Sequence, residues 1–191
     1  MTVGSDYLKF LKNRLEKISW PEALPKNSGM AAVLVALCRD PESGLEEILL
    51  IKRSGEPGYH SRQIAFPGGF KEKTDADVLK TALREAEEEI GLRVSDVEIL
   101  GKLPLEMTVR NILIFPWVGR IELPYNFILN PREVDKILFL SVDRLIEEGL
   151  SPIESPGKIR GESLGIKVGD ELVWGLTARI LKKLRELLLK G

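Results

Sequence analysis

The sequence has only one cysteine, Cys38, and no apolar run that reaches the roughly 18 residues of a membrane span. A single cysteine cannot form an internal disulfide, which excludes a disulfide-stabilised secreted fold and favours a reducing compartment. The 28 basic residues are balanced by 29 acidic ones, so the chain lacks the positive surface typical of nucleic-acid-binding proteins. These absences predict a cytoplasmic protein that binds neither nucleic acid nor membrane.

The composition is that of an ordinary folded protein. Hydrophobic residues make up 43% of the 191 positions and charged residues 30%, which is enough apolar material to bury a core. A chain of this length fits one compact domain with a small appendage. We expect a helical extension over residues 1–29 and the main domain over residues 30–191.

Hydrophobic periodicity divides the chain into alternating helices and strands. Helices are predicted at residues 6–18, 74–90, 142–148 and 174–189. Strands are predicted at residues 30–38, 46–54, 64–66, 97–103, 112–121 and 134–140. The glycine- and proline-containing stretch 151–172 is predicted to be a loop or hairpin. Because strands and helices interleave, we expect an α/β fold in which helices flank a mixed sheet on both faces, an α/β/α sandwich.

The predicted helix at 74–90 carries an unusual row of acids. Thr74 and Asp77 have the spacing of a capping box, and Gly91 is a natural helix stop. At about 100° per residue, the apolar side chains share one face, while Glu85, Glu88 and Glu89 fall together on a different arc. Three carboxylates are therefore expected on one patch near the negative end of the helix.

Such a patch is unfavourable unless something positive binds it. Like charges three or four residues apart destabilise a helix, and the helix dipole at that end adds to the cost. A solvated acidic face is the ordinary interpretation of a glutamate run. Here no lysine occupies the partner positions on that arc, and a glycine-rich turn precedes the helix. These features favour a bound Mg²⁺ or Mn²⁺, which prefer carboxylate oxygens.

The segment 68–92 resembles the Nudix box, G-x5-E-x7-R-E-U-x-E-E-x-G-U, where U is a bulky aliphatic residue. Its fixed places are filled by Gly69, Arg84, Glu85, Glu88, Glu89, Gly91 and Leu92. Ala86 stands at an aliphatic place. The first acidic place is taken by Asp75, which is followed by eight rather than seven residues before Arg84. So many fixed positions in the right order make the resemblance specific.

The resemblance implies a Nudix fold and hydrolysis of a nucleoside diphosphate linked to another group. It implies that Glu85, Glu88 and Glu89 are catalytic and hold the metal, with Glu85 also acting as a base in some members of the family. Arg84 is expected to position a carboxylate rather than to touch substrate. Gly69 is expected to let the backbone approach the site, although a simple turn glycine would look the same.

The preceding segment, 49–69, resembles the coenzyme A pyrophosphatase branch of the family, L-L-T-x-R-S-x-x-x-R-x-H-x-G-Q-x-x-F-P-G-G. The residues that match in register are Leu49, Leu50, Arg53, Ser54, His60, Gln63, Phe66, Pro67, Gly68 and Gly69. Three positions depart from the branch: Ile51 replaces Thr, Gly58 replaces Arg and Arg62 replaces Gly. The resemblance implies a pyrophosphatase that splits CoA into 3′,5′-ADP and a phosphopantetheine fragment.

Four residues are predicted to contact the nucleotide substrate: Arg53, His60, Arg62 and Gly69. Arg62 lies four residues from the lost arginine at Gly58 and can supply the missing cation. His60 has an equally simple structural interpretation as a loop histidine bonded to the backbone. Arg53 could bind phosphate or form a surface ion pair.

Nudix enzymes often recruit a base or further metal ligand from outside the box. Glu133, which precedes the strand at 134–140, is the leading candidate for this catalytic role, and an exposed loop acid is the plain alternative. Glu106 and Asp135 are the fallback candidates. The apolar side chains of the last helix are expected to form core or the surface of a homodimer.

Other functions remain open on the sequence alone. The same chemistry could act on ADP-ribose, a dinucleotide or a nucleoside triphosphate, because the box handles the diphosphate and not the appended group. An isopentenyl-diphosphate isomerase shares the fold but needs a cysteine near the site, and Cys38 lies in the first core strand. A non-catalytic Nudix-like binding module usually lacks the box glutamates, and all three are present here.

Overall fold

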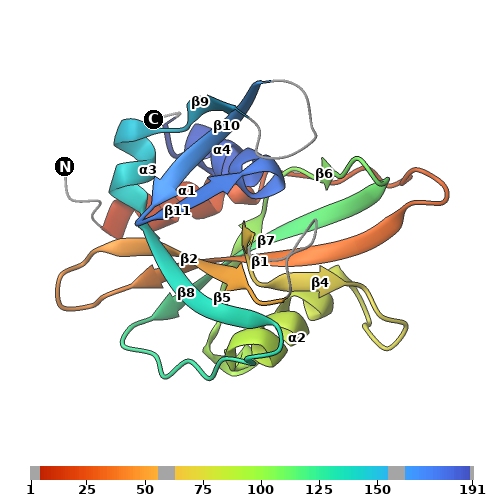
Figure 1. Cartoon of the computed structure of the whole chain (residues 1–191), viewed down its shortest axis with the longest axis horizontal. Helices are drawn as coiled ribbons and strands as arrows, with labels where there is room; N and C mark the ends of the chain where they lie inside the picture. The colour runs from red at the N-terminus through yellow and green to blue at the C-terminus, as the bar shows by residue number, and fades with distance from the viewer. Residues whose placement is uncertain (1–4, 56–62, 155–161, 190–191) are drawn as a thin grey trace.

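The computed structural model describes residues 5–55, 63–154 and 162–189. Within this part of the chain a mixed sheet carries helices on both faces (Figure 1). Helix α2 (Val78–Ile90) covers one face, and α1 (Ser5–Leu15), α3 (Val142–Glu148) and α4 (Gly175–Leu189) cover the other. The predicted α/β/α sandwich is confirmed.

The main sheet is built around β1 (Gly29–Arg39), which pairs in parallel with β7 (Ile112–Glu122) over its whole length. Around these two lie β2 (Glu46–Arg53), β3 (Ile64–Ala65), β4 (Gly68–Phe70), β5 (Glu98–Lys102), β6 (Glu106–Met107) and β8 (Val134–Ser141). The strand order is β3-β2-β1-β7-β5, while β4 pairs with β1, β6 with β7 and β8 with β2. The near-continuous burial of β1 is typical of a strand covered on both faces.

Strands β2 and β4 both pair with β1, at different ends. β2 pairs with residues 37–39 of β1, and β4 pairs with residues 31–33. The two strands must therefore diverge along β1, and β3 pairs with the far end of β2. The end of β2 and the start of β4 meet the C-terminal half of α2, where Arg53 and Gly68 both contact Glu89.

The stretch predicted as a loop or hairpin is a second sheet. β9 (Ser151–Glu154), β10 (Glu162–Val168) and β11 (Glu171–Trp174) are antiparallel neighbours in the order β11-β10-β9. Ile166, Val168 and Val173 are buried in the core that α1 and α4 share, and this burial outweighs the glycines and proline of the segment. The prediction of one hairpin was too simple, and α4 begins at Gly175, after β11 ends.

The start of the acidic helix also differs from the prediction. α2 begins at Val78 with Asp77 as its N-cap, whose side chain accepts a hydrogen bond from the backbone N–H of Lys80. The capping box at Thr74 is wrong, because Thr74 is exposed and donates to Glu72 instead. Gly91 ends the helix in the left-handed conformation at φ 68°, as predicted. α1 ends at Leu15, earlier than expected, and a short 3-10 turn spans Val94–Asp96.

The N-terminal helix is packed against the rest of the chain. Leu11 and Leu15 are buried in the same core cluster as the apolar face of α4. The division at residue 30 remains a prediction. Among the described residues, no helix is both long enough and apolar enough to cross a membrane.

Candidate active site

Two glycines bring the backbone of β4 against α2. The N–H of Gly68 donates to Glu89 Oε2 at 2.9 Å, and a β-carbon at Gly68 would overlap the Ala32 carbonyl and the Val33 backbone. A β-carbon at Gly69 would overlap the carboxylate of Glu85. Gly69 therefore provides the space that Glu85 occupies, which is a stricter requirement than a turn glycine would impose.

Helix α2 presents its acids because its small and apolar side chains face the sheet. Ala82, Ala86 and Ile90 are buried against the main sheet, as the helical periodicity predicts. Glu85 is half-buried, and Glu89 has no exposed surface. The two glutamates lie one turn apart and both reach toward β4.

Arg84 joins the turn before the helix to two of the glutamates. Its Nε and Nη2 donate to the two oxygens of buried Asp75 at 3.0 and 3.1 Å, which is a bidentate ion pair. Its Nη1 lies 3.0 Å from Glu85 Oε1 and 2.8 Å from Glu88 Oε2. Hydrogen bonds from Arg84 hold the pKa of the Asp75 carboxyl well below its usual range. Arg84 thus orients carboxylates, as the sequence predicts for it.

Glu89 is the buried centre of the site. Arg53 Nη1 donates to its Oε1 at 2.9 Å, and the Gly68 N–H holds its Oε2, so both oxygens are fixed. The pKa of Glu89 is raised to about 7, mainly by burial; the charges of Glu85 and Glu133 contribute to the rise, while Arg53 and the Gly68 N–H oppose it. A buried acid with such neighbours is typical of functional sites.

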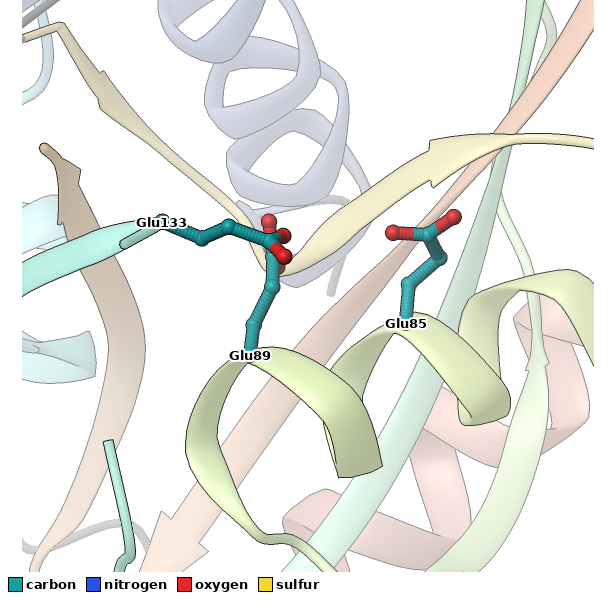
Figure 2. A group of neighbouring side chains, drawn as sticks. All are labelled: Glu85, Glu89 and Glu133. Atoms are coloured by element: carbon teal, nitrogen blue, oxygen red, sulfur yellow. The ribbon is translucent and has the colours of Figure 1, made fainter. Parts of the chain in front are cut away.

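Glu133 reaches the same site from the loop that precedes β8. It lies just before β8, whose first residue, Val134, pairs with Arg53 at the end of β2. The Ser54 N–H donates to the Glu133 carbonyl at 2.9 Å, and Asn130 Nδ2 donates to its carboxylate at 3.0 Å. Figure 2 shows the side chain of Glu133 reaching over α2 toward Glu89, with Glu85 one turn along the helix.

Three carboxylates therefore converge. One oxygen from each of Glu85, Glu89 and Glu133 lies within 4.8 Å of the other two (Figure 2). Burial is the main cause that raises the pKa of Glu85, and the charges of Glu88 and Glu133 add to it, so the acids repel one another when ionised. This donor set, all carboxylate oxygen and partly buried, suits a hard divalent cation.

Of the predicted site residues, Glu85, Glu89, Glu133, Arg53 and Gly69 come together. Glu88 is outside that group, because it lies on the exposed side of α2 and pairs with Arg84. His60 and Arg62 lie outside the described residues. Of the fallback candidates, Glu106 on β6 is bound by Arg179 and Lys183 of α4 at 2.8 and 2.7 Å.

Sequence reasoning missed three groups that organise the site. Asp75 was matched only to an acidic place of the box, and its role as the partner of Arg84 appears in the contacts alone. The Gly68 N–H is a backbone donor and leaves no sequence signal. Asn130 was not considered, although the Asn130-Pro131 pair is a recognisable turn signal just before Glu133.

Comparison with protein families gives a match between residues 29–156 and the NUDIX domain model. Among curated proteins, the chain is 37% identical over 166 residues to the uncharacterized Nudix hydrolase NudL of Shigella flexneri serotype 5b, covering 84% of this chain and 83% of the relative. NudL of Escherichia coli strain SMS-3-5 is also 37% identical, over 164 residues, covering 83% of this chain and 82% of the relative.

Two solved structures support the fold. A MutT/nudix family protein from Enterococcus faecalis superposes with a TM-score of 0.52 at 18% identity, covering 94% of this chain and 68% of that one. The Ap4A hydrolase of C. elegans, in a binary complex, gives a TM-score of 0.51 at 20% identity, covering 62% of this chain and 85% of that one. At these identities the likeness concerns the architecture alone.

Proposed function

The chain belongs to the Nudix hydrolase family, whose members act on nucleoside diphosphate derivatives, and we propose that it cleaves the diphosphate linkage of CoA or a CoA derivative. The products would be 3′,5′-ADP and a phosphopantetheine fragment. The observation that carries the hydrolytic part is the convergence of Glu85, Glu89 and Glu133 within 4.8 Å. The CoA part is supported by the match of segment 49–69 to that branch of the family.

The donor set fits a divalent cation, and we propose Mg²⁺ or Mn²⁺. Glu85, Glu89 and Glu133 would hold it, and the absent side chain at Gly69 leaves the space that the Glu85 carboxylate needs. Mg²⁺ characteristically takes a few carboxylates together with substrate phosphates. A bound cation supplies positive charge that offsets the charge of the diphosphate oxygens.

The acidic and basic side chains of the site have separate roles in the proposed reaction. A water oxygen attacks one phosphorus, the bond from that phosphorus to the bridging oxygen breaks, and a carboxylate takes the proton of the water. Glu133 and Glu85 are the candidate bases. Arg84 fixes Glu85 through the contact at 3.0 Å, and Arg53 fixes Glu89 through the contact at 2.9 Å. Each acid is thus oriented before substrate arrives.

Glu88 stays in the proposal as a ligand because of its place in the box. It shares Arg84 Nη1 with Glu85, so it lies beside one of the three converging acids. We expect Glu88→Gln to lower turnover by about tenfold or more, as loss of a metal-site group typically does. The matched control is Glu87→Gln, an exposed neighbour on the same helix, which should keep parental turnover. Equal activity of both variants would remove Glu88 from the site.

The decisive experiment is a substrate panel assayed with Mg²⁺ and with Mn²⁺. CoA, ADP-ribose, a dinucleoside polyphosphate and a nucleoside triphosphate would be compared by kcat/KM, with products identified by mass. We expect CoA or an acyl-CoA to give the highest value and 3′,5′-ADP to be released. Turnover of ADP-ribose with CoA inert would overturn the CoA proposal and leave the hydrolase intact. No cation-dependent cleavage of any substrate would overturn both.

A further inference from the structure

The loop before β8 is bound to the end of α2 through its backbone. The N–H of Ile128 donates to the Ile90 carbonyl at 3.0 Å, and the N–H of Asn130 donates to the Glu89 carbonyl at 2.9 Å. Carbonyls at a helix C-terminus lack partners within the helix, so these two donors satisfy them. The backbone of Asn130 is therefore fixed relative to Glu89.

The side chain of Asn130 is fixed as well, because its amide donates one hydrogen bond and accepts another. Its Nδ2 donates to Glu133 Oε1 at 3.0 Å, and its Oδ1 accepts from the Arg132 N–H at 3.2 Å. The Glu133 N–H in turn donates to the Asn130 carbonyl at 3.0 Å. An asparagine that bonds the backbone two residues on forms an Asx turn, and this turn aims the amide nitrogen at Glu133.

We infer that Asn130 is a positioning residue for the proposed hydrolysis: it holds the Glu133 carboxylate over α2, at a fixed place relative to Glu89. The inference rests on the proposed function. Without this donor, repulsion from Glu85 and Glu89 would favour rotation of the Glu133 side chain away from them. The amide is also neutral, so it orients the carboxylate without the positive charge that would compete with a cation.

The chain offers a selective variant and a matched control. Asn130→Ser keeps a side-chain oxygen that can accept from the Arg132 N–H, but its side chain is too short to reach Glu133. Asn130→Ala removes both contacts, and Arg132→Ala changes an exposed side chain in the same turn while leaving all the described backbone bonds. Comparing Asn130→Ser with Asn130→Ala therefore separates the Glu133 contact from the stability of the turn.

The measurement is the Mn²⁺ affinity of the 191-residue chain by titration calorimetry, alongside turnover. Groups that orient metal ligands typically contribute 10- to 100-fold in affinity. We expect Asn130→Ser to weaken Mn²⁺ binding by about tenfold while its unfolding temperature stays near that of the parent, and Arg132→Ala to bind as the parent does. Parental affinity in Asn130→Ser would overturn the inference.

A double-mutant cycle with Glu133→Ala tests whether Asn130 acts through Glu133. If it does, Asn130→Ser should change Mn²⁺ affinity by less than about twofold once Glu133 is gone, because coupled residues lose their separate effects. An undiminished effect in that background would show a purely structural role and overturn the inference. If the parent protein binds Mn²⁺ but hydrolyses no substrate, the proposed function alone is overturned. If the parent protein does not bind Mn²⁺, both the proposed function and the role of Asn130 are overturned.

Discussion

Two buried glutamates lie near opposite ends of β2, and they differ in the partners that surround their carboxylates. Glu46 begins the strand, and Glu89 contacts Arg53, which ends it. Burial is the largest cause that raises the pKa of each carboxyl. Yet both oxygens of Glu89 have a partner within 3.0 Å, whereas Glu46 Oε2 has no hydrogen bond to any described residue and its Oε1 lies 4.0 Å from Arg120.

The difference indicates that burial alone does not prepare an acid to bind a cation. A carboxylate can help hold a cation only if it faces other donors and its orientation is fixed beforehand. Glu89 meets both conditions, because Arg53 and Gly68 orient it and two further acids converge on it. Glu46 has basic side chains nearby, and their charges lower its pKa only in part.

The largest expected effect comes from neutralising each glutamate in turn. Glu89→Gln should reduce turnover by about a thousandfold or more, because a metal site supplies several kcal/mol of charge stabilisation. Glu46→Gln, made as the matched variant, should stay within about twofold of the parent. Steady-state kinetics with Mn²⁺ checks both. Comparable losses in the two variants would break the contrast between the two acids.

The next effect concerns the space around the site. In Gly69→Ala the added β-carbon would overlap the Glu85 carboxylate, so we expect turnover to fall by about a hundredfold, as for a 1 Å displacement in a catalytic group. Gly29→Ala is the control, because a β-carbon there would meet the Ile112 side chain at an ordinary 3.5 Å. Full activity of Gly69→Ala would show that Glu85 needs no such space.

Cation affinity should depend on pH through Glu89. Its raised pKa of about 7 keeps it protonated below that pH in the cation-free protein, and a cation must then displace the proton. Mn²⁺ affinity should therefore rise with pH up to about 7 and level off above it. Arg53→Met removes a charge that lowers this pKa, so the plateau should move to higher pH, whereas Lys80→Met, on the exposed start of α2, should leave it in place. Calorimetry at several pH values measures this, and a flat profile would contradict it.

The smallest effect is on stability and concerns Glu46. Because its folded-state pKa is raised, the folded protein binds more protons than the unfolded chain above the ordinary value of 4.5, and stability falls as pH rises from there through the raised pKa. Glu46→Gln removes this dependence. Above pH 4.5 the unfolding temperature of the parent should therefore fall relative to that of the variant, which thermal denaturation measures. If the unfolding temperatures of the parent and the variant changed with pH in parallel, ionisation of Glu46 would not destabilise the folded protein.

Much of the fold could be predicted because burial follows periodicity. The apolar run that became β1 and the helical face that became the buried side of α2 were both visible as patterns. The three-stranded sheet was not, because glycine and proline signalled turns while only long-range packing of Ile166 and Val173 decides that strands form. Local propensity yields to tertiary contacts in such a segment.

The site was predicted in part for a similar reason. Helix geometry puts Glu85, Glu88 and Glu89 on one arc of α2. It cannot separate Glu88 from the other two, because a helical wheel gives the angle of each side chain and not the structure that faces it. The sheet edge at β4 faces Glu85 and Glu89, whereas Glu88 is exposed beside Arg84. Glu133 is a candidate because it precedes a strand, and Asn130-Pro131 signals a turn there, but the hydrogen bond from Asn130 to the Glu133 carboxylate has no sequence signal.

The divergence of β2 and β4 along β1 limits how this protein can change. One deleted residue in β4 would shift its register with β1 and turn every following side chain to the opposite face. Phe70 would then come to the place where Gly69 leaves room for a carboxylate, or the paired Gly68 N–H would leave Glu89. Insertions and deletions between residues 63 and 70 should therefore be far rarer among functional homologues than substitutions there.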